Sequence, residues 1–293
     1  MRPYSRVYAT VNLDAVASNM RSMRDNLPAS TLIMGSVKAD GYGHGSVPVA
    51  KTIEPYVFGY AVATIDEGII LRRHGINKTI LILGVTHESR YEDLLRYDIR
   101  TAMFQYEKAK KLSDLALKQG KKAVVHLALD TGMSRIGMKA DREHAKEAAA
   151  IAALEGIEVE GLFTHFARAD ETDKSAYEEQ YRRYKEFLGY LKELGVKIPI
   201  RHCSNSAGIV ESLESNHMDM VRAGIAIYGM YPSDEVDHNS VKLTPAMEIK
   251  SCITYIKEIE AGTAVSYGGT FVADHTMKVA TIPVGYGDGY VRS

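Results

Sequence analysis

Short apolar runs alternate with amphipathic segments along most of the chain. Runs rich in Val, Ile and Leu are typical of strands that are buried on both faces. Eight such runs occupy residues 31–38, 57–64, 79–84, 99–104, 124–130, 159–166, 200–204 and 220–228. Apolar residues at helical spacing lie between them, at 47–52, 66–74, 91–95, 107–119, 142–153, 177–194 and 207–213. Strands that alternate with helices pair in parallel.

The number of repeats predicts the architecture. Eight strand–helix units are typical of a closed (β/α)8 TIM-type barrel, so we predict an α/β fold with this barrel over residues 1–232. The rhythm changes in residues 233–293, where a polar stretch at 233–241 is followed by strand-like runs at 247–256, 270–272 and 278–282. Few strands are present for a domain that must bury a face. We therefore expect residues 233–293 to be the start of an incomplete all-β domain.

Composition narrows the class of protein. The 293 residues are 45% hydrophobic and 25% charged, with a formal net charge of -1, which is typical of a globular chain with a sizeable core. Near-neutral charge indicates neither nucleic acid nor a membrane surface as a partner. Cys203 and Cys252 lack the spacing of metal ligands, so buried thiols and no metal are expected. No signal-peptide pattern and no run of transmembrane length is present, which predicts a cytoplasmic location.

A glycine-rich turn follows the first predicted barrel strand. The sequence Val-Lys-Ala-Asp-Gly-Tyr-Gly-His-Gly occupies residues 37–45, with Lys38 at the strand end. A lysine shielded from water more readily presents a neutral amine, which can attack an aldehyde. The glycines allow the backbone to approach a ligand such as a phosphate. Spacing alone favours the plainer interpretation, a surface lysine in a glycine-rich loop.

Further candidate residues follow the later strands. Barrel active sites lie at the carboxyl ends of the strands. Arg135 follows strand five, His165 ends strand six, and Asn205 and Ser206 follow strand seven. Taken singly, His165 fits a barrel histidine and Arg135 a surface residue. Arg222 differs, because it lies within the apolar eighth run, and a buried cation needs a ligand or a carboxylate as partner.

These motifs resemble, in order, those of the alanine racemase family. The resemblance rests on residues 37–45, on Asp-Thr-Gly-Met-Ser-Arg-Ile-Gly at 130–137, and on Val-Ser-Tyr-Gly-Gly-Thr at 265–270, together with the candidates above. It implies the cofactor pyridoxal 5'-phosphate and a pair of acid/base residues, Lys38 and Tyr267. It also implies that Lys38 carries the cofactor and that Arg135 binds the substrate carboxylate. The remaining cofactor-binding residues that it implies are Tyr42, His165, Asn205, Ser206, Arg222, Gly224 and Ile225.

The resemblance also implies an activity and an assembly. The expected reaction is the interconversion of L- and D-alanine, which supplies D-alanine for peptidoglycan. In the family the tyrosine comes from the partner subunit, so a homodimer with shared active sites is expected. Because an ordinary tyrosine has a pKa of about 10, it needs cationic neighbours to work near neutrality. His165 and Arg222 are the expected cations.

Two positions and the chain length depart from the family pattern. Gly41 replaces the usual Ala, and Ala128 replaces a lysine that is carbamylated in many relatives. An anion such as chloride could take the place of that carbamate beside Arg135. The β domain of the family also continues beyond residue 293, so the sequence is expected to be truncated at its C-terminus.

Other functions stay open at this point. A serine racemase variant fits the same motifs. A barrel decarboxylase of the same cofactor class would favour an acidic residue where Arg222 lies. A non-catalytic barrel that only binds the cofactor is the alternative if truncation abolishes activity.

Overall fold

The computed structural model describes residues 6–291 and divides into two compact units. The larger unit is Asn12–Ala246. The described part of the smaller unit joins residues 6–11 to residues 247–291.

Eight parallel strands of the larger unit close into a barrel. They are β2 (Leu32–Ser36), β3 (Gly59–Val62), β4 (Thr79–Ile82), β5 (Arg100–Met103), β6 (Ala123–Asp130), β8 (Ile157–Phe163), β9 (Ile200–His202) and β10 (Met220–Ala223). The strands pair in this order, and β10 pairs back with β2 to complete the ring. A two-residue strand, β7 (Met138–Lys139), adds to β6. Each barrel strand coincides with one predicted run, so the (β/α)8 prediction is confirmed.

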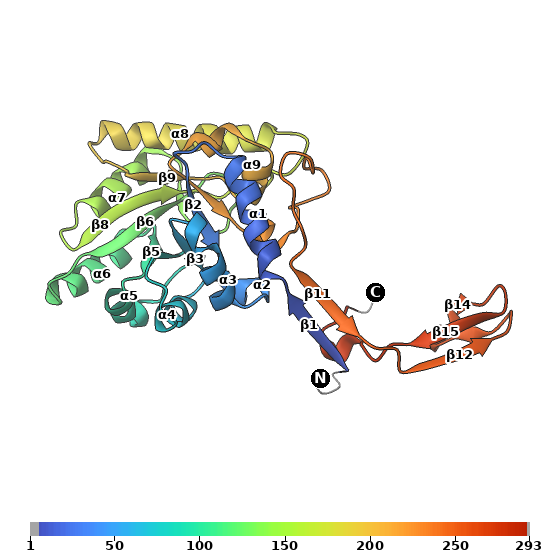
Figure 1. The fold of residues 1–293 in the computed structure, drawn as a ribbon. Coiled ribbons are helices and arrows are strands. Elements are labelled where there is room, and N and C mark those ends of the chain that lie inside the picture. Colours follow the sequence, from blue (N-terminus) through green and yellow to red (C-terminus); the bar gives the residue numbers. More distant parts are fainter. Residues whose placement is uncertain (1–5, 292–293) are drawn as a thin grey trace. The chain divides into compact units, whose positions relative to one another are not determined.

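Helices connect the strands and surround them (Figure 1). They are α1 (Leu13–Asp25), α3 (Ser46–Ile53), α4 (Ile65–Arg73), α5 (Tyr91–Tyr97), α6 (Tyr106–Lys118), α7 (Arg142–Ala152), α8 (Ser175–Glu193) and α9 (Ser206–Val210). The predicted amphipathic segments are confirmed as α3 to α9. Among residues 6–291, no helix has the length and apolar character needed to span a membrane.

Two apolar layers stabilise the barrel. Inside the ring, Met34, Ala61, Leu81 and Met220 from four neighbouring strands form one buried cluster. The main core lies between the strands and the outer helices, and its largest buried side chains include Tyr60, Tyr184 and Phe187. Strands that contact both layers need apolar residues on both faces, which explains their nearly continuous apolar runs.

The larger unit extends past the polar stretch at 233–241. Val236 and Val241 are buried in its core, and the Tyr231 hydroxyl donates to the carbonyl of Val241 at 2.9 Å. The Asn19 amide of α1 donates to the carbonyl of Thr244 at 2.9 Å and accepts from its N–H at 2.8 Å. These contacts bind the segment up to Ala246 to the barrel.

The smaller unit is formed by antiparallel pairs. Strand β1 (Val7–Val11) pairs with β11 (Met247–Ser251), and β12 (Tyr255–Ile259) pairs with β15 (Met277–Thr281). Strands β13 (Ala264–Val265) and β14 (Phe271–Val272) form a third pair. The predicted single run at 247–256 is therefore two strands with different partners. Strand β1 was not predicted, because its partner lies far away in the sequence.

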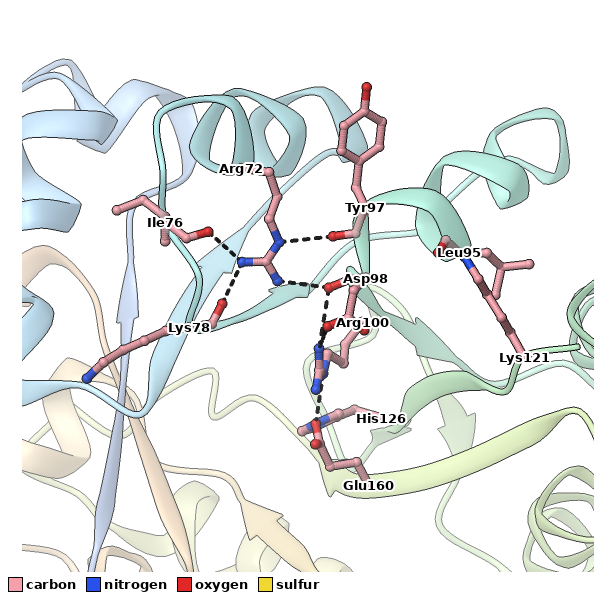
Figure 2. Close-up of polar contacts among 10 residues, drawn as sticks. All are labelled: Arg72, Ile76, Lys78, Leu95, Tyr97, Asp98, Arg100, Lys121, His126 and Glu160. Atoms are coloured by element: carbon pink, nitrogen blue, oxygen red, sulfur yellow. Dashed lines mark hydrogen bonds and ion pairs between the residues drawn. The ribbon is translucent and has the colours of Figure 1, made fainter. Parts of the chain in front are cut away.

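One arginine joins three segments at the amino-terminal side of the barrel strands (Figure 2). Arg72, near the end of α4, donates to the carbonyls of Ile76 at 2.8 Å and Lys78 at 2.7 Å. It also donates to the carbonyls of Tyr97 and Asp98, both at 2.9 Å. The segments before β4 and β5 are thus held by one planar guanidinium, whose donors point in fixed directions.

We predict that Arg72→Lys lowers the free energy of unfolding by about 2–4 kcal/mol, because an ammonium cannot reach all four carbonyls. Urea unfolding of the 293-residue chain measures this change. The control is Arg73→Lys, the same substitution on the neighbouring, exposed residue of α4. Equal stability of the two variants would contradict a structural role for Arg72.

Candidate active site

A cavity of about 280 Å³ opens at the carboxyl ends of the barrel strands. Eight of the predicted residues line it: Lys38, Tyr42, His165, Asn205, Ser206, Arg222, Gly224 and Ile225. Ser36, Leu83, Asp170, Ala207 and Pro232 complete the lining. The fold therefore brings together eight predicted residues from Lys38 to Ile225, all within the larger unit.

Lys38 begins a turn with unusual backbone geometry. The residues that follow it are left-handed, with φ of 50° at Ala39, 50° at Asp40, 63° at Gly41 and 53° at Tyr42. L-residues pay about 1–2 kcal/mol each for this conformation. Three of the four carry side chains, so the turn needs support from its surroundings.

Side chains outside the turn supply that support. Glu67 of α4 accepts the N–H of Ala39 at 2.8 Å with one carboxylate oxygen and the N–H of Ala63 at 2.7 Å with the other. Within the segment, the Asp40 carboxylate accepts the N–H of Ser46 at 2.7 Å. Glu67 thus joins the Lys38 turn to the end of β3, and both partners are backbone groups.

The far side of the cavity presents hydroxyls and backbone amides. The Ser206 hydroxyl accepts the N–H groups of Gly224 at 2.9 Å and Ala226 at 3.3 Å. A Cβ added to Gly224 would lie 3.5 Å from the Ser206 hydroxyl and 3.6 Å from the Tyr42 hydroxyl. The two hydroxyls therefore converge on the space left free by Gly224. Hydroxyls and amides around such a space can hold a phosphate.

Arg222 is buried under the same cavity, 3% exposed. Its guanidinium donates to the carbonyls of Thr164 at 2.7 Å, Cys203 at 3.0 Å and His202 at 3.0 Å. It also donates to the ring nitrogen Nδ1 of His202 at 2.8 Å. Burial lowers the pKa of Arg222 to about 10, so it stays a cation at neutral pH.

One donor of this guanidinium has no partner. The buried Arg222 Nε lacks a hydrogen-bond acceptor among residues 6–291. A buried N–H that stays unpaired is costly. Since Arg222 lines the cavity, an acceptor nitrogen or oxygen on a ligand would satisfy it.

His165 is neutral. Burial lowers its pKa to about 3, and the charges of Arg222, Arg135 and Lys38 act in the same direction. The expectation that His165 supplies a positive charge is therefore wrong. Arg222 donates to its Nδ1 at 3.3 Å, so the cation of this pair is the arginine.

Arg135 is exposed in the loop after β6 and does not line the cavity. Its charge nevertheless contributes to lowering the pKa of both His165 and Arg222. Ala128, the position of the family lysine, is buried beside Phe163 and Ala102. Tyr267 belongs to the smaller unit, where it is 89% exposed. The roles predicted for Arg135 and Tyr267 stay predictions.

Sequence reasoning missed several residues that shape this site. Glu67 gave no motif signal beyond a helix-capping pattern with Thr64, and only the structure shows its contact with Ala39. Ser36 could have been found by alternation along the strand, since it lies two residues before Lys38. No local pattern marks His202, whose partners Arg222 and His126 lie on other strands.

Comparisons with known proteins agree with this geometry. Residues 11–232 match the family "Alanine racemase, N-terminal domain" and residues 246–293 match "Alanine racemase, C-terminal domain". The alanine racemase of Desulforamulus reducens is 43% identical over 287 residues, covering 98% of this chain and 77% of the relative. These matches define a two-domain barrel protein of the racemase class.

Solved structures give the same result. Alanine racemase from Clostridium difficile 630 has a TM-score of 0.90 and 41% identity, over 99% of this chain and 76% of that chain. Alanine racemase from Bacillus anthracis with bound L-Ala-P has a TM-score of 0.86 and 33% identity, over 99% and 75%. The chain belongs to the alanine racemase family.

We predict that Glu67→Gln loosens the Lys38 turn, because an amide has one acceptor oxygen where the carboxylate has two. The free energy of unfolding should fall by about 1–3 kcal/mol. Hydrogen exchange of the amides at Ala39 and Ala63 should accelerate selectively. The control is Glu92→Gln, at an exposed position of α5, and amide protection of the turn equal to that in the control would rule out this role.

A second prediction concerns pH. The pKa of His165 is about 3 in the folded chain, whereas an unfolded histidine titrates near 6.5. Below about pH 6.5 the unfolded chain therefore binds a proton that the folded chain does not. His165 thus contributes a loss of about 1.4 kcal/mol of stability per pH unit between about pH 6 and 3.

Urea unfolding of the wild type and of His165→Asn from pH 8 to pH 5 measures this contribution. The variant should lose less stability than the wild type as the pH falls. Parallel pH dependence of the two proteins would mean that His165 titrates normally in the folded chain.

Proposed function

We propose that this chain is a pyridoxal-phosphate-dependent alanine racemase that interconverts L- and D-alanine. The observation that carries the proposal is the convergence of all eight predicted cofactor-binding residues on one cavity. Membership of the alanine racemase family, and the L-Ala-P bound by the relative from Bacillus anthracis, support the substrate.

The residues present fit the cofactor at both of its ends. The unpaired Arg222 Nε suits the ring nitrogen, which accepts a hydrogen bond when it is unprotonated. The space beside Gly224, with the Ser206 and Tyr42 hydroxyls around it, suits the phosphate. Lys38 lines the same cavity and can bind the aldehyde covalently.

The bound cofactor would supply an electron sink that makes the α-proton of the amino acid acidic. The protein residues then do the remaining work. The Lys38 amine would exchange a proton with the α-carbon on one face, and the Tyr267 hydroxyl on the other. Arg135 would hold the substrate carboxylate. Arg222 stays protonated and donates its hydrogen bond without giving up a proton, which limits the electron sink.

The wider setting is part of the same proposal. Tyr267 would reach the site from the partner subunit of a homodimer, as the family resemblance implies. The D-alanine formed would serve peptidoglycan synthesis in the cytoplasm. The two-base mechanism with Lys38 and Tyr267 and the homodimer rest on the resemblance.

We predict that the 293-residue chain mixed with pyridoxal phosphate gains a visible absorbance band. Borohydride reduction should fix the cofactor on the peptide that contains Lys38, as located by mass spectrometry. Lys38→Ala should bind no cofactor covalently and lose all conversion of L-alanine to D-alanine. The control is Lys51→Ala, an exposed lysine of α3, which should behave as the wild type.

The substrates and products distinguish the proposed alanine racemase from the alternative functions. Exchange of the α-proton of alanine in D₂O supports a racemase, whereas release of CO₂ would point to a decarboxylase. Faster conversion of serine than of alanine would point to the serine variant. A covalent cofactor with neither exchange nor CO₂ release would leave a cofactor-binding barrel and overturn the proposed activity.

A further inference from the structure

A chain of hydrogen bonds runs from the cavity through the interior of the barrel. Arg222 of β10 donates to Nδ1 of His202, at the end of β9, at 2.8 Å. His202 Nε2 and Nδ1 of His126, on β6, are 2.8 Å apart. Nε2 of His126 lies 3.0 Å from the carboxylate of Glu160 on β8. Both histidines are fully buried, so water does not compete for these bonds.

The chemistry of the two ends fixes the direction of every bond. A guanidinium can only donate, so Nδ1 of His202 must accept and carries no proton. The proton of His202 is therefore on Nε2, which donates to Nδ1 of His126. By the same argument His126 is protonated on Nε2 and donates to Glu160. The chain starts at a cation, ends at an anion and passes through two neutral rings of one tautomer.

The pKa directions agree with neutral rings. Burial lowers the pKa of His126, against the opposing effect of Glu160. Burial and the charge of Arg222 lower the pKa of His202 well below its ordinary value. The charged groups that act on the two rings are Glu160, Arg100 and Arg222.

The backbone is adapted to this arrangement at two points. The register between β6 and β8 shifts after Val125, so that Val125 pairs with Val159 but His126 pairs with Gly161. Glu160 is thus the extra residue of a β-bulge, which redirects a side chain. A Cβ on Gly161 would lie 2.4 Å from Nδ1 of His126, so only glycine leaves room for the ring.

Glu160 lies toward the opposite end of the barrel from the cavity. Arg100, the first residue of β5, is 3.5 Å from its carboxylate and also contacts Asp98 at 2.9 Å. Figure 2 shows Arg100 between Asp98 and Glu160, with His126 beside the carboxylate of Glu160. The Glu160 side chain is 18% exposed. Burial raises its pKa, but the hydrogen bond from His126 and the charge of Arg100 outweigh this and lower it. The chain therefore ends on a carboxylate anion.

We infer that Glu160 is a positioning residue for Arg222. Its carboxylate fixes the tautomers of both histidines, and His202 in turn holds the guanidinium of Arg222, which borders the cavity. Among residues 6–291 no carboxylate forms an ion pair with Arg222, so Glu160 provides the balancing charge through the two rings. The consequence for catalysis rests on the proposed function, whereas the tautomers do not.

The test uses ¹⁵N-histidine NMR of the full 293-residue chain. In the wild type, both His126 and His202 should carry their proton on Nε2 and should not titrate between pH 6 and pH 8. Substitutions of each histidine assign the signals. A proton on Nδ1 of either ring, or titration of either ring in this range, would overturn the inference. This measurement requires neither a variant of Glu160 nor an activity assay.

The matched variants are Glu160→Gln and Glu158→Gln, which make the same change at two positions of β8, the second of them exposed. Glu160→Gln removes the anion, and its amide can also donate to Nε2 of His126, so the ring signals should change to a mixture of tautomers. The kcat for alanine should fall by about tenfold, with KM within about twofold. Glu158→Gln should leave all of these values unchanged.

A purely structural role predicts a different pattern. Glu160→Gln would then lower the unfolding temperature but leave the histidine signals and kcat as in the wild type, and this result would overturn the inference. Absence of racemisation in the wild type would contradict the proposed function alone, because the tautomers are measured independently.

Discussion

The burial of one guanidinium constrains much of the barrel. Removing a charge from water costs several kcal/mol unless partners replace the lost hydration. Arg222 obtains them from carbonyls at the ends of β8 and β9, which point at it instead of continuing the sheet. The ends of these strands also carry His165 and Asn205. The solvation of Arg222 and the placing of the cavity residues are therefore achieved by the same backbone.

The Lys38 turn adopts a backbone conformation that its own residues disfavour. Four consecutive residues take left-handed angles, and three of them carry side chains. Such strain persists only where the surroundings over-determine it, and it is common at functional sites. Glu67 and Asp40 provide this support through backbone N–H groups. The turn that begins at the lysine is therefore held by these contacts, although its glycine-rich sequence would be flexible alone.

The barrel was predictable because its strands are buried on both faces and therefore appear in the sequence as apolar runs. The candidate site residues also follow the strand ends, where barrel active sites lie. The roles of the site residues came from the family resemblance and not from spacing. Contacts between distant segments left no local signal. Strand β1 needs its partner β11, and the bulge at Glu160 depends on the register of β6. The charge of His165 was wrongly predicted because the sequence does not show that its ring is buried. Burial, together with the charges of Arg222 and Arg135, lowers its pKa and keeps it neutral.

The neutral His165 shifts the electrostatic problem to Arg222. Arg222 and His165 are 3.3 Å apart, so two positive charges there would repel and protonation of one group disfavours protonation of the other. The arginine keeps its proton because its pKa, even lowered to about 10, remains far above that of the histidine. A guanidinium that stays charged can donate a hydrogen bond to a ring nitrogen but cannot readily protonate it. The guanidinium donates this hydrogen bond most reliably when contacts within the barrel fix its orientation. The chain of hydrogen bonds from Arg222 through His202 and His126 to Glu160 provides such contacts, since each donor in it has an acceptor inside the barrel. The remaining Nε donor is then free for a ligand alone.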